Sequence, residues 1–236
     1  MKNFLLIAIT AVLLQALIGC QKEELLYSCD KETNEWVKNN LAEIQQMNRS
    51  DMLPLSGEQQ RGCFRAFTPE QRYGVWIDKL IQVRNIGLNS KELKHIDLLL
   101  ATMKVDWFDE QTREDADRFA EIDQFLKEWV DNAYNLLGWS RDEVGSIVAS
   151  LYEVERKDNT IVLRVIDVIT MADHGGGGGS GGYTFDCNCY IYDDWCFNNK
   201  KCKNDVGCNK SNWGCGSFWS NGCNGLCGAT VIVKPA

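Results

Sequence analysis

Cysteine dominates the C-terminal part of the chain. Eight of the 11 cysteines lie within residues 183–236, at Cys187, Cys189, Cys196, Cys202, Cys208, Cys215, Cys223 and Cys227. A stretch this short rarely buries enough apolar surface to fold unaided, and cross-links are the usual remedy. Zinc ribbons use paired Cys-x₂-Cys knuckles, and this stretch contains neither such a knuckle nor a histidine. We therefore expect four disulfides and no metal, although the spacing does not choose among the possible pairings.

A glycine run separates this module from the rest of the chain. Residues 174–182 read His-Gly-Gly-Gly-Gly-Gly-Ser-Gly-Gly, which is typical of a flexible linker. A phosphate-binding loop would need a following helix with Lys-Ser/Thr, and Tyr183-Thr184-Phe185 supplies neither. Cleavage after Gly182, as in double-glycine leaders, is the alternative, and it would release residues 183–236.

The N-terminus carries an export signal. Lys2 precedes an apolar stretch, Phe4–Leu14, that is too short for a stable transmembrane helix. Leu17-Ile18-Gly19-Cys20 resembles the lipobox of bacterial lipoproteins, which implies removal of residues 1–19 and acylation of Cys20. The acidic pair in Gln21–Glu24 resembles a surface-export tag of Gram-negative lipoproteins. We expect a protein anchored by lipid in its own outer membrane or cell surface, outside the cytoplasm; an ordinary secretory signal is the alternative.

In residues 20–173, apolar residues recur at the spacing of an α-helix, which predicts an acidic helical domain. Two capping boxes mark helix starts, at Thr68–Gln71, where Pro69 takes the first helical position, and at Ser140–Glu143. The fold class we expect is mainly α: an antiparallel bundle of about five helices, a Gly-rich linker and a small disulfide-rich module. The expected helices run along Trp36–Met47, from Pro69 toward Gly87, from Ser90 to about Met103, along Glu114–Leu137 and from Ser140 to about Leu151. Thr160–Thr170 is rich in β-branched residues and indicates a strand.

The chain shows no arrangement typical of an enzyme. Its two histidines are His95, expected to be solvated or capping on a charged helix start, and His174, beside the glycine run. Neither position suits a general base, and we expect neither catalysis nor a cofactor. A net charge of −8 also argues against nucleic acid as a partner.

Cys29 and Cys63 are the thiols of the helical domain. In an oxidising compartment we expect them to form a disulfide that staples a helical hairpin. The alternatives are two buried free thiols, or partners in the C-terminal module.

Aromatic residues lie between the C-terminal cysteines. A disulfide-stapled module has little interior, so we expect several rings to be exposed and to contact a protein, a sugar or a membrane interface. The alternative is that they pack over the disulfides. The candidate binding residues are Tyr190, Tyr192, Trp195, Trp213, Phe218 and Trp219.

The cysteine ladder from Cys187 to Cys215 resembles the disulfide-rich bacteriocin fulvocin C, and the chain resembles the bacteriocin fulvocin C-related proteins. The segment CFRAFTPEQRYGVW, Cys63–Trp76, is similar to a hallmark of that family. The last two cysteines depart from the bacteriocin pattern, because Cys223-x₃-Cys227 stands where that pattern closes with Cys-x-Cys. The resemblance implies antibacterial activity on the envelopes of related bacteria. The other hypothesis is a non-toxic adhesin that binds a receptor or a glycan on neighbouring cells.

Overall fold

The computed structural model describes residues 27–28, 30–164, 188–196, 200–203 and 210–228. This part of the chain is mainly helical and ends in a disulfide-rich region, which confirms the predicted fold class. Its elements are α2 (Lys31–Asn39), α3 (Leu41–Ile44), α4 (Arg49–Met52), α5 (Gly57–Ala66), α6 (Pro69–Arg84), α7 (Ser90–Thr102), η1 (Val105–Phe108), α8 (Glu110–Glu114), α9 (Ala116–Leu137), α10 (Arg141–Val148), β1 (Val154–Lys157), β2 (Thr160–Leu163), β3 (Cys202–Lys203), η2 (Ser217–Trp219) and β4 (Leu226–Cys227). We call residues 30–164 the helical body and the described residues from 188 onward the C-terminal segment.

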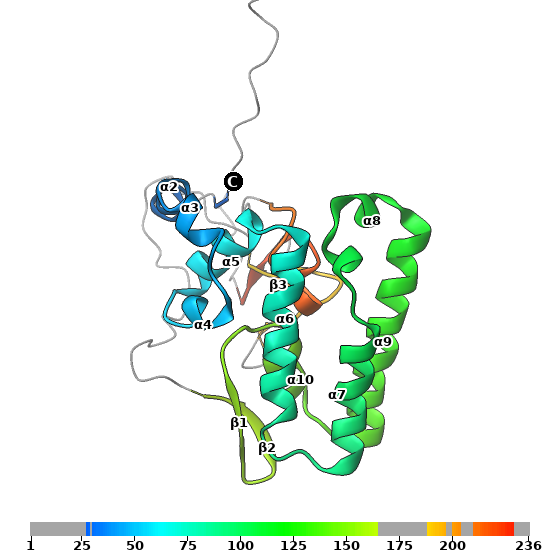
Figure 1. The fold of residues 1–236 in the computed structure, drawn as a ribbon. Coiled ribbons are helices and arrows are strands. Elements are labelled where there is room, and N and C mark those ends of the chain that lie inside the picture. The colour runs from blue at the N-terminus through cyan, green and yellow to red at the C-terminus, as the bar shows by residue number, and fades with distance from the viewer. Residues whose placement is uncertain (1–26, 29, 165–187, 197–199, 204–209, 229–236) are drawn as a thin grey trace, which may run out of the picture.

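The long helices lie side by side. Helices α6, α7 and α9 run alongside one another, α10 packs against α6 and α9, and the short helices α2–α5 gather beside one end of α6 (Figure 1). The C-terminal segment, orange to red in Figure 1, lies beside α5 and α6 and contacts α10 through η2. It is therefore packed on the helical body.

Both predicted capping boxes are confirmed. The backbone N–H of Gln71 donates to Thr68 Oγ1 at 3.3 Å, and the Gln71 side chain accepts from the Thr68 N–H at 3.1 Å. The same exchange joins Ser140 and Glu143, at 3.2 and 2.8 Å. Because each box satisfies N–H groups that have no partner inside a helix, α6 begins at Pro69 and α10 at Arg141.

The N-terminal helices differ from the prediction. The apolar stripe along Trp36–Met47 is divided between α2 and α3, because the chain turns at Asn40, whose side-chain amide donates to the Trp36 carbonyl at 2.7 Å. Helix α5 was not predicted. Its buried positions include Gln60 and Gly62, which conceal the apolar period.

The predicted strand is confirmed where the chain is described. Strand β2 pairs antiparallel with β1 through a two-residue turn at Asp158 and Asn159, whose φ values of 49° and 63° are those of a tight hairpin. The N–H of Ile161 donates to the Glu143 carboxylate at 3.0 Å, which ties the hairpin to α10. Residues 165–170 of the prediction lie outside the described residues.

One apolar core runs through the helical body. Its largest fully buried side chains include Phe64, Trp76, Phe108 and Trp129. Lys79 is also fully buried; its Nζ donates to the Tyr152 carbonyl, and burial holds its pKa well below the ordinary value. The core extends without interruption into the C-terminal segment.

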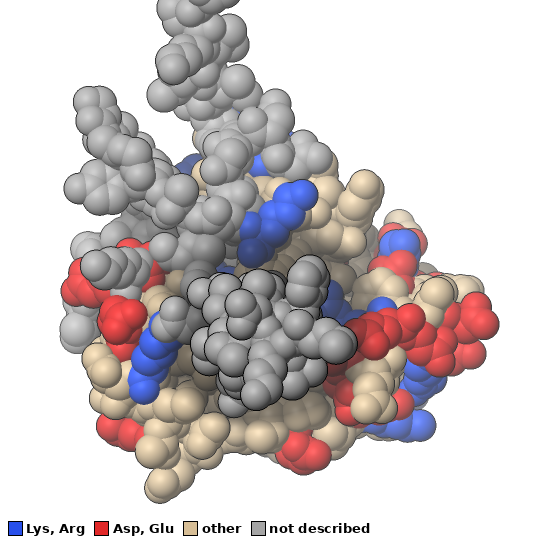
Figure 2. Space-filling view, turned by 90° about the horizontal axis from the view of Figure 1, so that it is seen from above, with Lys and Arg blue, Asp and Glu red and all other residues tan. Residues whose placement is uncertain are grey.

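Most of the acidic side chains lie on the surface of the body; Glu92 and Glu143 are buried. Figure 2 shows the largest group of acidic side chains at one edge of the face seen from above, on the side where Figure 1 places α8 and the start of α9. Glu110, Glu114, Asp115 and Asp117 are exposed there, as expected for a solvated helical surface. In the described part of the chain, no helix combines the length and the apolar character that crossing a bilayer requires.

Candidate functional site

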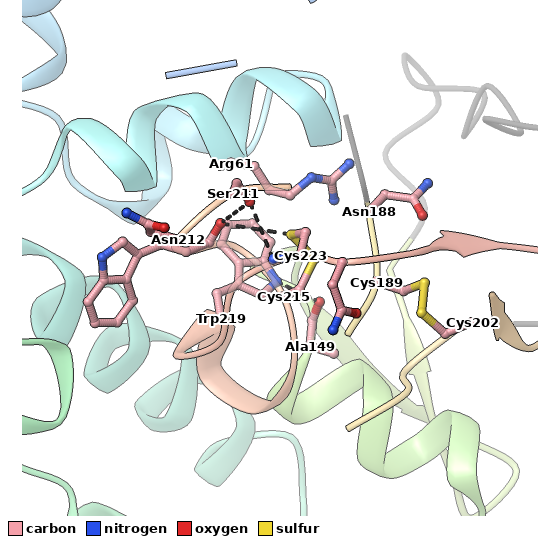
Figure 3. Close-up of a disulfide and its surroundings, with 12 residues drawn as sticks. Arg61, Ala149, Asn188, Cys189, Cys202, Ser211, Asn212, Cys215, Trp219 and Cys223 are labelled. Carbon is pink, nitrogen blue, oxygen red and sulfur yellow. Dashed lines mark hydrogen bonds between the residues drawn. A yellow bond between two sulfur atoms is a disulfide. The ribbon is translucent and has the colours of Figure 1, made fainter. Parts of the chain in front are cut away.

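Two aromatic residues of η2 complete the core of the helical body. The Trp219 ring packs edge to face against Phe64, with centroids 5.4 Å apart, and the Phe218 ring packs likewise against Trp76 at 5.1 Å. The Trp219 indole N–H donates to the carbonyl of Ala149 at the end of α10, at 3.0 Å. Figure 3 shows Trp219 beside the disulfide that joins Cys215 to Cys223 in the C-terminal segment. The rings thus gain the apolar contacts and the hydrogen-bond partner that a buried indole needs.

The backbone that carries these rings is strained. Phe218 and Trp219 have φ values of 56° and 52°, in the left-handed region that bulky side chains avoid. Such residues cost on the order of 1–3 kcal/mol each and persist where the surroundings fix them. Here the surroundings are the rings of the helical body together with the segment's own Cys215–Cys223 disulfide and the hydrogen bond from the Gly214 N–H to the Trp219 carbonyl. Packing against the body is therefore one of the interactions that hold η2 in this conformation.

A third tryptophan is held between two arginines of the body. The guanidinium carbons of Arg72 and Arg113 lie 4.4 and 4.3 Å from the ring centroid of Trp213. Burial lowers the pKa of Arg72 to about 10 and also lowers that of Arg113. Guanidinium groups stack on aromatic faces more readily than ammonium groups do, which suits arginine to this position.

Body arginines also bind the backbone of the C-terminal segment. Arg65 donates to the Trp213 carbonyl and to Ser211 Oγ, both at 3.1 Å. Arg141 donates to the carbonyls of Cys196, at 2.6 Å, and Asp194, and it pairs with the Asp194 carboxylate at 3.2 Å. Because buried carbonyls need donors, the arginines fix where the segment lies.

On the body, most of these contacts with the C-terminal segment are made by residues of Cys63–Trp76. Phe64 and Trp76 meet the η2 rings, while Arg65 and Arg72 bind Trp213. The segment was expected to matter for its resemblance to a family hallmark, and its contact with the C-terminal segment was not predicted. Neither the rings nor the arginines carry a local signal for a contact with residues far along the chain.

Three disulfides are described, and they confirm the disulfide-rich prediction for six of the eight cysteines. They join Cys189 to Cys202, Cys196 to Cys227, and Cys215 to Cys223. Cys202 and Cys227 face each other in the β3–β4 pair. Cys187 and Cys208 lie outside the described residues, as do Cys20 and the linker with Gly182.

Among the described residues, one group of cysteines could offer sulfur ligands to a metal. The Sγ atoms of Cys189, Cys196 and Cys227 lie within 4.8 Å of one another. All three are engaged in disulfides, and metals bind the thiolate form. A soft metal would therefore bind here only after reduction.

The prediction of exposed aromatics is wrong for three residues. Trp213, Phe218 and Trp219 are 2%, 1% and 5% exposed. The physical reason is that the helical body supplies the interior that a short stapled segment lacks. Trp195 and Tyr190 are half-buried, and Tyr192 alone among the six candidates is exposed, at 80%.

The predicted disulfide between Cys29 and Cys63 is wrong. Cys63 is a free thiol, fully buried on α5, and burial raises its pKa to about 12. The alternative of a buried free thiol holds for Cys63, because α5 turns this position into the core. Cys29 lies outside the described residues.

His95, expected to be solvated or capping, is half-buried instead. Its ring stacks on Trp129, with centroids 4.3 Å apart, and burial lowers its pKa. Nearby, burial alone would raise the pKa of Glu92, but hydrogen bonds from Arg156 and from the Asn89 backbone bring it below its ordinary value. The Glu92–Arg156 pair joins α7 to the hairpin. The His95 ring packs against Trp129, so its role in the structure is packing.

A groove of about 300 Å³ opens where α9 meets the C-terminal segment. On one side, α9 contributes apolar side chains together with Asp123, Lys127 and Asp131. On the other, the C-terminal segment contributes mostly polar groups. The lining residues of the segment are Tyr192, Asp193, Ser217, Ser220 and Asn221.

The polar side of the groove is built around Asp193. Its carboxylate accepts a hydrogen bond from the Ser217 N–H, and burial is the main cause of its raised pKa. Gly216, at φ 71°, lies against this group: a Cβ there would stand 2.9 Å from Asp193 Oδ2 and 2.7 Å from Asn221 Nδ2. Only glycine allows this close approach.

Comparison of the chain with protein families, with curated proteins and with solved structures finds no significant match.

Proposed function

We propose that this protein is a non-enzymatic lipoprotein, anchored through Cys20, whose helical body holds a bacteriocin-like C-terminal segment in a latent state. The single observation that carries the proposal is the position of Phe218 and Trp219 in the core of the body. The cysteine ladder supplies the bacteriocin-like character, and its target would be the envelope of neighbouring bacteria.

Latency follows from the burial of the rings. A segment that acts on a membrane needs exposed aromatic or apolar side chains to enter the interface. Trp213, Phe218 and Trp219 are instead covered by the body, and Trp213 is also bound by the body's Arg72 and Arg113. Antibacterial action would therefore require the segment to leave the body, and cleavage near Gly182 would remove the covalent connection through the linker.

The test uses the full chain from residue 21, oxidised, with a specific protease site placed within residues 176–181. Uncut protein, cut protein and cut protein with Arg65→Ala and Arg141→Ala are compared for growth inhibition and dye leakage on neighbouring strains. The two substitutions lie in the body, so the released segment is unchanged. We expect inhibition only where the segment dissociates, as followed by size-exclusion chromatography.

Two outcomes would overturn the proposal. Equal inhibition by uncut and dissociated protein would remove latency. Dissociated segment that keeps its disulfides but inhibits no strain and causes no leakage would remove the bacteriocin-like activity.

The second candidate is a non-toxic surface protein that binds a partner or a glycan. The groove between α9 and the C-terminal segment favours it, because the exposed ring of Tyr192 lines that groove. Binding of the uncut protein to cells without any growth defect would support this function over the first.

A further inference from the structure

We propose that the groove between α9 and the C-terminal segment binds a neutral saccharide of one or two rings. The inference rests on the second candidate function, surface binding, and names the class of its ligand. The groove's volume of about 300 Å³ is at the lower end of the range of roughly 300–1,000 Å³ for small-molecule sites.

The two sides of the groove differ in polarity as the two faces of a sugar do. The α9 side presents Phe119, Ile122, Leu126 and Val130. The opposite side presents carboxylate, amide and hydroxyl groups. A saccharide ring combines an apolar face of C–H groups with a rim of hydroxyls, so it can satisfy both sides at once, whereas a purely apolar ligand would leave buried polar groups unpaired.

The polar groups are held in place before any ligand arrives. The Ser217 N–H fixes one oxygen of Asp193, and the Ser220 hydroxyl donates to the Ser217 carbonyl at 2.8 Å. Gly216 lets Asp193 and Asn221 approach closely. Preorganised groups lose little entropy on binding, which favours recognition of a small polar ligand.

The charges of the groove disfavour an anion. Asp123, Asp131 and Asp193 line it, and Lys127, its one lining cation, is paired with Asp123 at 2.6 Å. An acidic ligand would meet three carboxylates and a lysine that already has a partner. A neutral polyhydroxylated ligand meets acceptors for its hydroxyl protons instead.

Tyr192 supplies a stacking surface. Its ring is 80% exposed, and Tyr190 packs against it edge to face at 5.5 Å. A large exposed ring beside a polar groove can stack on C–H groups of the sugar that α9 does not cover, while its own hydroxyl stays in water. The other five aromatic candidates are half-buried or buried, so this role belongs to Tyr192.

The experiment is a titration of the oxidised chain from residue 21, by calorimetry and by ligand-observed NMR. The probes are D-glucose, D-galactose, D-mannose, N-acetyl-D-glucosamine, maltose, cellobiose, lactose and chitobiose, with D-glucuronate and D-galacturonate as anionic counterparts. We expect at least one neutral sugar to bind and each uronate to bind more weakly than its neutral parent.

Variants locate the binding. Tyr192→Ala should weaken the Kd of that sugar by roughly three- to tenfold, and Tyr192→Phe should keep it near that of the parent. Leu136→Ala is the matched control: Leu136 is 70% exposed on α9, the helix that lines one side of the groove, but does not itself line the groove. Circular dichroism checks that each variant keeps its helices.

The proposal is overturned if no neutral sugar binds, if the uronates bind more tightly, or if Tyr192→Ala binds as well as Leu136→Ala. Cell binding, measured in parallel on neighbouring strains, distinguishes failure of the sugar-binding proposal from failure of the surface-binding function on which it rests. Cell binding that survives in Tyr192→Ala, without sugar binding, would retain surface binding and reject the groove. If neither cell binding nor sugar binding is found, both the surface-binding function and the saccharide groove are rejected.

Discussion

The indoles of Trp76 and Trp219 pack edge to face, with centroids 5.8 Å apart and planes at 89°. Trp76 is fully buried in α6, and Trp219 is 5% exposed in η2. Since the two lie on opposite sides of the glycine run in the sequence, their contact places the cysteine-rich segment in the same apolar core as the helices.

Trp219→Ala should destabilise the helical body as well as the C-terminal segment. Removing a buried tryptophan typically lowers the free energy of unfolding by about 3–5 kcal/mol, and the Ala149 carbonyl would also lose its donor. Urea unfolding followed by circular dichroism of the helices measures the change. Tyr192→Ala, at an exposed site, should change the free energy by less than about 0.5 kcal/mol. An unchanged helical transition in Trp219→Ala would contradict the shared core.

Arg141→Met should loosen the loop around Asp194 and Cys196. The guanidinium binds two carbonyls and one carboxylate, so we expect a loss of about 1–3 kcal/mol. Arg141→Lys should restore little, because an ammonium group cannot reproduce the fork of donors. Lys127→Met, which breaks an exposed pair, is the control, with an expected change below about 1 kcal/mol. Full rescue by lysine in urea unfolding would show that charge alone matters.

Two of the three described disulfides should differ clearly in their contribution to stability. Cys196 and Cys227 are separated by 31 residues, and Cys215 and Cys223 by 8. Loop-closure entropy gives about 3.7 kcal/mol for the first bridge and about 2.5 kcal/mol for the second. Double serine variants of each pair, compared by urea unfolding, should follow this order. The reverse order would mean that packing around Cys215 and Cys223 outweighs chain entropy.

Cys63 should resist alkylation in the folded protein and react once it unfolds. Its pKa of about 12 exceeds the value of about 8.5 for an unfolded thiol. Its contribution to stability is therefore present below about pH 8.5 and is lost as the pH rises toward 12. The difference in unfolding free energy between the parent protein and Cys63→Ala should shrink across this window. Rapid labelling of Cys63 by iodoacetamide under native conditions would show that the thiol is accessible.

Local features were predictable from the sequence, while the long-range partners were not. The capping boxes at Thr68 and Ser140 depend on residues three positions apart, so their chemistry can be read directly from the chain. The burial of Trp219 depends on Phe64 and Trp76, which no local pattern connects to it. The aromatic rings were predicted to be exposed because a short disulfide-stapled module has little apolar interior of its own. The helical body provides the interior in which three of these rings are buried.

Helix α5 shows why the Cys63 prediction failed. Gln60 is buried because its side-chain amide donates to the Met52 carbonyl at 3.1 Å, and a Cβ at Gly62 would stand 2.9 Å from Val37. Polar and glycine residues thus occupy core positions, which hides the helical period. The capping box at Ser56 and Gln59 was the available signal. With α5 recognised, Cys63 would have been placed on its buried side.

The contact between Trp76 and Trp219 also bears on the order of folding during synthesis. Trp219 emerges from the ribosome long after α6 is complete, so the hydrophobic interior of the helices stays open until then. Until then the helices lack the Phe218 and Trp219 rings that complete their core. Late completion of the core would couple final maturation to oxidation of the cysteines that flank η2.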